Sequence, residues 1–115
     1  MRRPYLLTGA LLVVFGIAGF FQDPLLGLFE VNPVHNLVHL VSGLFVLAAA
    51  SYGIGTMRTC GKMLGLLYLA LAIAGFALPA GDIFRVMHLN QPDNMLHLYL
   101  AGFFMYYGLL APPRL

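Results

Sequence analysis

Four long stretches of apolar residues constrain the fold of this chain more than any other feature. They cover about residues 5–21, 33–52, 61–78 and 91–110. Crossing the ~30 Å hydrocarbon core of a bilayer takes about 20 residues of helix, and a helix satisfies its own backbone groups there. Because the stretches show no sustained alternation, helices are predicted rather than barrel strands. We expect an all-α integral membrane protein whose four transmembrane helices form a single domain over residues 1–115.

The composition agrees with this class of protein. Hydrophobic residues make up 61% of the chain and charged residues 9%, and the mean hydropathy is +0.88. A soluble domain carries about 25% charged residues, so the lipid bilayer is the expected surrounding of this chain. The net charge of +2 comes without a basic run, which argues against a nucleic acid partner. The single cysteine, Cys60, has no partner for a disulfide and is expected to be a free thiol.

The start of the chain has one feature of a signal peptide, a basic Met1–Arg3 followed by an apolar run. No cleavage site of small residues follows that run, so a retained helix is predicted.

The charged residues outside the apolar stretches predict an orientation. One side carries only basic residues: Arg2, Arg3, Arg58, Lys62 and Arg114. The other side carries the acidic residues and one arginine: Asp23, Glu30, Asp82, Asp93 and Arg85. The positive-inside rule therefore predicts a multi-pass protein with both termini and the 53–60 loop in the cytoplasm. The apolar outer segments 25–29 and 83–87 are predicted to lie in the interface as short helical turns.

An internal repeat links the two halves of the chain. Gly9 and the run Ile17-Ala18-Gly19-Phe20 recur 56 residues later as Gly65 and Ile73-Ala74-Gly75-Phe76. The pattern Asn32-x-x-His35-Asn36-x-x-His39-Leu40 recurs 58 residues later as Asn90-x-x-Asp93-Asn94-x-x-His97-Leu98. We predict a duplicated helical hairpin, with repeat 1 over 5–52 and repeat 2 over 61–110. The two copies would be parallel and related by a pseudo-twofold axis along the membrane normal.

Glycines at matching places in the repeat are predicted to let helices pack closely, as small residues do in membranes. The pair Gly61-x-x-x-Gly65 also fits a weak motif for helix dimerisation.

The polar residues of the repeat form the candidate site. Asn32 and Asn90 stand where helices should begin, as N-caps. Residues three and four apart share a helix face, so two polar stripes are expected, one made of His35, Asn36 and His39 and the other of Asp93, Asn94 and His97. The pseudo-twofold would turn both stripes toward the bundle interior, where His39 would meet its counterpart His97 at equal depth.

Three roles are consistent with this cluster. In the first, which we prefer at this point, hydrogen bonds between the Asn and His side chains and an Asp93–His35 pair organise the helix bundle. In the second, three imidazoles and a carboxylate bind zinc or another divalent ion, with the ligand set His35, His39, Asp93 and His97; a haem between His39 and His97 ranks behind a metal ion. In the third, the chain moves a small cation or a proton, or serves as an accessory subunit.

Enzymatic chemistry has no support in the sequence. Ser42 follows His39 by three residues, but no acid is placed to orient that histidine as a base. His88 is expected to be an interfacial polar residue. The identity of any cofactor stays open, as does a homo-oligomer or a membrane partner protein.

Two segments resemble a known family. The run Gly27-Leu-Phe-Glu-Val-Asn-Pro-Val-His-Asn-Leu-Val-His-Leu-Val-Ser-Gly-Leu44 resembles the hallmark segment of the small bacterial four-helix membrane proteins catalogued as domain of unknown function 4383. The stretch Asn90–Leu98 is similar to that family's closing motif, although Gln91 and Pro92 replace the small residues expected there. The resemblance covers nearly the whole chain and implies a bacterial cytoplasmic membrane location. It implies no activity, substrate or cofactor.

Overall fold

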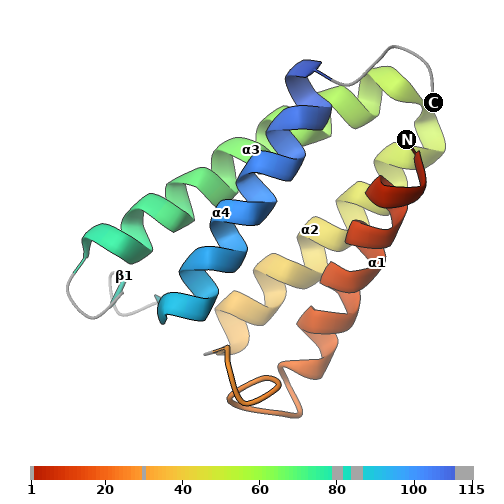
Figure 1. Cartoon of the computed structure of the whole chain (residues 1–115). Helices are drawn as coiled ribbons and strands as arrows, with labels where there is room; N and C mark the ends of the chain where they lie inside the picture. The colour runs from red at the N-terminus through yellow and green to blue at the C-terminus, as the bar shows by residue number, and fades with distance from the viewer. Residues whose placement is uncertain (1, 30, 79–81, 84–86, 111–115) are drawn as a thin grey trace.

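The computed structural model describes residues 2–29, 31–78, 82–83 and 87–110. Within them lie four α-helices: α1 (Arg2–Ala18), α2 (Pro33–Tyr52), α3 (Ile54–Ala77) and α4 (Gln91–Met105), the last continued by a π-helical turn, η2 (Tyr106–Leu110). Helix α1 packs on α2 and α3 packs on α4 along their lengths, so the chain forms two hairpins that lie side by side (Figure 1). The predicted all-helical bundle is therefore present.

The connection between α2 and α3 differs from the prediction. Gly53 alone separates the two helices, with φ 121° and ψ −173°, and residues 54–60 form the first turns of α3. The predicted loop over 53–60 is wrong. A glycine in this backbone region, which other residues avoid, reverses the chain within one residue. No proline in 54–60 prevents the helix from starting at once.

The connection between α3 and α4, predicted as the second outer segment, differs from the prediction where it is described. Ile83 pairs with Met87 in a short antiparallel ladder of β1 (Asp82–Ile83) and β2 (Met87–His88), and residues 84–86 of the predicted helical turn lie outside the described residues. The connection between α1 and α2, called the first outer loop after its predicted side, folds back on itself with a bridge between Leu25 and Phe29 and buries Leu25. Three charged residues used to predict the orientation lie outside the described residues: Glu30, Arg85 and Arg114.

Glycines bring the helices of each hairpin into backbone contact. A Cβ at Gly43 of α2 would lie 2.6 Å from the carbonyl oxygen of Gly9 on α1. In the second hairpin, a Cβ at Gly61 of α3 would lie 2.7 Å from the carbonyl oxygen of Phe104, and Gly65 packs against Met105. The Gly61-x-x-x-Gly65 pair thus serves packing inside this chain, where small residues allow close approach.

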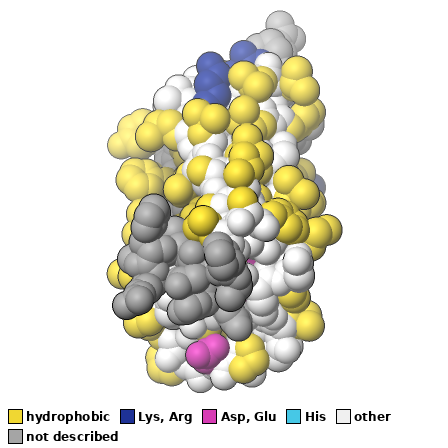
Figure 2. All heavy atoms as spheres, turned by 90° about the vertical axis from the view of Figure 1, so that its left-hand side faces the viewer, with side chains coloured by type: hydrophobic (Ala, Val, Ile, Leu, Met, Phe, Trp, Pro, Cys, Tyr) yellow, Lys and Arg dark blue, Asp and Glu magenta, His cyan; other side chains and the backbone are white. Residues whose placement is uncertain are grey.

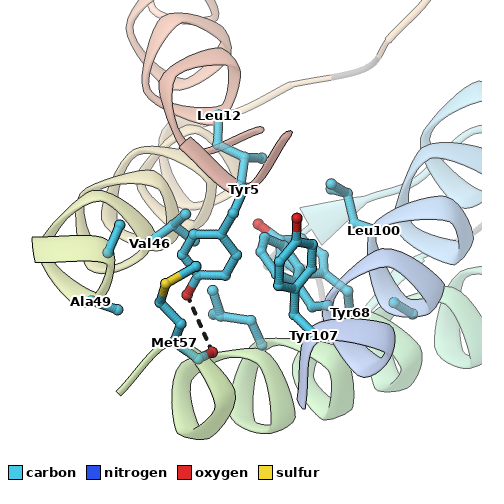
Figure 3. Close-up of a cluster of buried hydrophobic side chains, with 12 residues drawn as sticks. Tyr5, Leu12, Val46, Ala49, Met57, Tyr68, Leu100 and Tyr107 are labelled. Atoms are coloured by element: carbon cyan, nitrogen blue, oxygen red, sulfur yellow. Dashed lines mark hydrogen bonds between the residues drawn. The ribbon is translucent and has the colours of Figure 1, made fainter. Parts of the chain in front are cut away.

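Large buried side chains fill the space between the hairpins (Figure 3). Tyr5 of α1 packs edge-on against Phe104 of α4, with ring centroids 6.4 Å apart, and its hydroxyl donates to the Met57 carbonyl oxygen at 3.4 Å. Tyr68 of α3 stacks on Phe104 with ring centroids 6.0 Å apart. The hairpins therefore meet through aromatic rings rather than through backbone contacts.

The outside of the bundle is apolar. Large hydrophobic side chains are exposed on every helix, including Leu7, Phe45, Met63 and Leu98. Figure 2 shows such side chains along one side of the bundle, with Lys and Arg at its upper end and an acidic side chain at its lower end. Helices α2 and α3 are long and apolar enough to cross a membrane, and α1 contains a shorter apolar helix.

Candidate metal site

The candidate site starts from two capped helix ends. The Asn32 side chain accepts a hydrogen bond from the His35 N–H at 2.7 Å, and Pro33 occupies the first turn of α2. The Asn90 side chain accepts from the Asp93 N–H at 2.9 Å, and Asp93 accepts from the Asn90 N–H at 3.1 Å, which completes a capping box. These caps fix where α2 and α4 begin, and thereby which residues face inward one turn later.

Asn90 also joins the two hairpins at this end. Its side-chain N–H donates to the carbonyl oxygen of Leu28 in the first outer loop at 2.7 Å. The first outer loop is therefore held against the start of α4.

Three histidines converge just inside these caps. His35 and His39 of α2 and His97 of α4 are between 0% and 2% exposed. Nε2 of His97 lies 3.3 Å from Nε2 of His35 and 3.4 Å from Nε2 of His39. Among the described residues, these three form a group of metal-ligand type whose ligand atoms all lie within 4.8 Å of one another. The equivalent histidines of the repeat, His39 and His97, thus face each other as predicted.

Two of the three distances between these nitrogens match a tetrahedral metal ion. Nitrogens bound to zinc at about 2.0–2.1 Å lie about 3.3–3.4 Å apart when the geometry is tetrahedral. Both short distances around His97 have this length. Hydrogen bonds alone would not satisfy three such nitrogens well, because a neutral imidazole nitrogen either donates one hydrogen or accepts through one lone pair.

Asp93 occupies a different place from the three histidines. It is fully buried one turn before His97, and one of its carboxylate oxygens belongs to the capping box. The group of converging ligand atoms contains His35, His39 and His97 without this carboxylate.

Asn36 lies against Gly19, directly after the end of α1, and Asn94 lies against Gly75 of α3. A Cβ built on Gly19 would overlap the Asn36 amide oxygen, and a Cβ built on Gly75 would overlap the Asn94 amide oxygen. Each oxygen stands over a glycine Cα, where a weak Cα–H···O contact forms. The two amides therefore make the same contact in both hairpins.

Two further polar residues lie near the histidines: Tyr68 was not predicted, whereas the sequence already placed Ser42 three residues after His39. Tyr68 of α3 is fully buried, and its ring centroid lies 5.5 Å from that of His97 and 6.3 Å from that of His39. Ser42, buried one turn after His39, is next to the Tyr68 hydroxyl. The sequence repeat could have pointed to both residues, because each is polar where the matching position is apolar: Leu12 matches Tyr68 at an offset of 56, and Leu100 matches Ser42 at an offset of 58. Polar residues in only one of two copies mark a place where the copies diverge.

Comparison with known proteins identifies the family. The family described as domain of unknown function DUF4383 matches residues 2–110, nearly the whole chain. The chain belongs to the DUF4383 family. No curated protein and no solved structure matches it. The DUF4383 match therefore confirms the family expected from the two segments and carries no information on activity.

Proposed function

We propose that this DUF4383 protein is a four-pass membrane protein that binds a divalent transition-metal ion, of which zinc is the best fit, through His35, His39 and His97. The observation that carries the proposal is the pair of Nε2–Nε2 distances of 3.3 and 3.4 Å around His97. Both are edge lengths of a tetrahedral zinc site. The ligands come from both hairpins, so a bound ion would link them.

The surface of the bundle supports the membrane part of this proposal. Apolar side chains are exposed on all four helices, whereas a soluble protein rarely exposes large continuous apolar patches. The long axis of the bundle, 41 Å, suits a bilayer that is about 40–45 Å thick with its headgroups. Helix α4 and η2 together cover the 91–110 span of the fourth predicted crossing.

The charges support the orientation proposed from the sequence. Arg58 and Lys62 lie at the start of α3, and Asp23 lies in the first outer loop at the other end of the bundle. With Arg58 and Lys62 on the cytoplasmic side, the three histidines lie in the outer half of a bacterial plasma membrane.

Matching contacts support the proposal that the hairpins are duplicated and parallel. The Asn36–Gly19 contact corresponds to the Asn94–Gly75 contact at the offsets of the sequence repeat. Both hairpins also run from the same end of the bundle (Figure 1).

The convergence of the Nε2 atoms favours a metal ion over a purely organising role, because a neutral imidazole nitrogen can only donate one hydrogen or accept through one lone pair. Three nitrogens that converge on one point also suit a single ion better than a haem, whose two axial nitrogens stand about 4 Å apart across a flat ring.

Metal analysis tests the proposal. The purified chain, incubated with zinc and dialysed in mild detergent, should retain about one zinc ion per chain by elemental analysis, as a specific site would. His97→Ala should lose this zinc, because it removes the nitrogen shared by both short distances. His88→Ala, which changes the remaining histidine of the chain, is the matched control and should retain it.

The Asp93→Asn variant distinguishes a ligand set of three histidines from one that also includes the Asp93 carboxylate. Full zinc binding by this variant would show that three histidines suffice, and a loss as large as that of His97→Ala would add the carboxylate to the set. Zinc binding that is absent from the wild type, or unchanged in His97→Ala, would contradict the proposal and leave the cluster as an organiser of the bundle.

A further inference from the structure

The Tyr68 hydroxyl is a buried polar group whose surroundings do not explain it. It lies between the two hairpins, and among the described groups it completes no regular hydrogen bond, although Ser42 is its neighbour. A buried hydroxyl without a partner costs about 1–3 kcal/mol. Phenylalanine would fill the same space without this cost, so the hydroxyl requires an explanation.

The position of Tyr68 relates it to the histidines. Its ring is tilted by 33–34° from the rings of His39 and His97 and stacks on Phe104 with ring centroids 6.0 Å apart. The hydroxyl makes no direct hydrogen bond to an imidazole. An atom between the hydroxyl and the three Nε2 atoms would satisfy it.

A bound metal ion would need such an atom. Three histidines leave one corner of a tetrahedron open, which is the arrangement of zinc sites that keep an exchangeable fourth ligand. Neutral imidazoles leave both positive charges of a divalent ion in a low-dielectric interior, where unbalanced charge is costly. A hydroxide in the open corner would remove one of them.

We propose that Tyr68, with Ser42 beside it, binds the non-protein ligand at the fourth position of the three-histidine site, and that this ligand is an exchangeable water or hydroxide. The inference rests on the proposed metal site. Tyr68 acts as a positioning residue that hydrogen-bonds to the ligand and does not itself contact the metal. The site would accordingly also accept small anions such as azide.

The divergence between the repeats agrees with this assignment. The residues equivalent to Tyr68 and Ser42 are Leu12 and Leu100, both buried and apolar. A role in helix packing alone would be served by the same residue type in both copies. Tyr68 of repeat 2 and Ser42 of repeat 1 are instead polar, and these two side chains are neighbours beside the histidines.

Cobalt(II) provides the test, because its visible absorption reports the number and type of its ligands. The wild type loaded with cobalt should give the intense bands of a four-coordinate site, and azide should shift them. Tyr68→Phe should still bind cobalt, with shifted bands and an affinity for azide about 10- to 100-fold lower, the size typical of a lost outer hydrogen bond. Ser42→Ala should change the spectrum in the same direction.

Tyr5→Phe is the matched control, because Tyr5 is equally buried and its hydroxyl binds the Met57 carbonyl outside the site. It should leave the spectrum and the azide response unchanged. Spectra and azide affinities identical to wild type in both Tyr68→Phe and Ser42→Ala would overturn the inference while the metal site stands. Cobalt that does not bind the wild type, or binds without the histidines, would instead overturn the proposed function.

Discussion

At the scale of single residues, the absence of a side chain at Gly43 decides how closely α1 and α2 approach. A Cβ at Gly43 would lie 2.6 Å from the Gly9 carbonyl oxygen and 2.7 Å from the backbone nitrogen of Val13. These neighbours are backbone atoms, which cannot rotate away. Gly102 of α4 differs, since a Cβ there would meet nothing within 4 Å.

Gly43→Ala is therefore expected to lower the free energy of unfolding by about 1–3 kcal/mol, the usual cost of overpacking. Gly102→Ala should raise it by about 0.5–1 kcal/mol, because alanine is the better helix former. Unfolding of both variants and the wild type in detergent, followed by circular dichroism, measures the difference. Equal stabilities of the two variants would disprove the close backbone contact at Gly43.

The residue scale also shows what the sequence could reveal of the site. The repeat predicted that His39 and His97 would meet, because equivalent positions in two parallel copies lie at the same depth. It could not show that Asp93 completes a capping box, since a carboxylate three residues after an N-cap can bind the backbone or a ligand. Tyr68 was missed because it lies in an apolar helix with no polar neighbour in sequence.

At the scale of elements, helix ends that depend on local signals could be predicted. Asn32 and Pro33 start α2, and Asn90 starts α4, at the predicted residues. The beginning of α3 was misplaced because charged and polar residues near Arg58 and Lys62 suggested a loop, although polar residues also suit a helix that extends beyond the membrane. One residue, Gly53, then makes the whole connection.

Gly53→Ala should be destabilising by about 1–3 kcal/mol, because a φ of 121° with ψ near 180° is almost restricted to glycine. Gly55→Ala is the control, since it lies two residues later in α3 and a Cβ there would meet nothing within 4 Å. Thermal unfolding in detergent should show a lower midpoint for Gly53→Ala and no loss for Gly55→Ala. A Gly53→Ala variant as stable as the wild type would show that the connection tolerates another conformation.

At the scale of the whole molecule, the two hairpins share few close backbone contacts and depend on side chains between them. This interface is aromatic toward the end of the bundle where Gly53 lies, with Tyr5, Tyr68 and Phe104, and polar toward the capped ends of α2 and α4, with the three histidines. The sequence could predict the hairpins from the repeat, but not this division, because side chains from all four helices have to be placed before it exists.

The orientation proposed for the whole molecule is tested by labelling single cysteines. In a Cys60→Ser background, Gln22→Cys in the first outer loop should react with a membrane-impermeant maleimide added to intact cells. Gly55→Cys, at the opposite end, should react only after the cells are permeabilised. Both positions are exposed. The reverse pattern would invert the orientation, and equal reaction of both without permeabilisation would contradict a membrane-spanning bundle.

The one-residue connection at Gly53 has a mechanical consequence for the histidines. His35 lies 18 residues before Gly53 on α2, which is about 27 Å along a helix. If Gly53 serves as a hinge, a rotation of about 10° of one hairpin against the other moves His35 by about 5 Å relative to His97. A metal ion bound between His35 and His97 would then hold the two hairpins together at the end opposite Gly53. The angle between the hairpins would depend on whether the ion is bound.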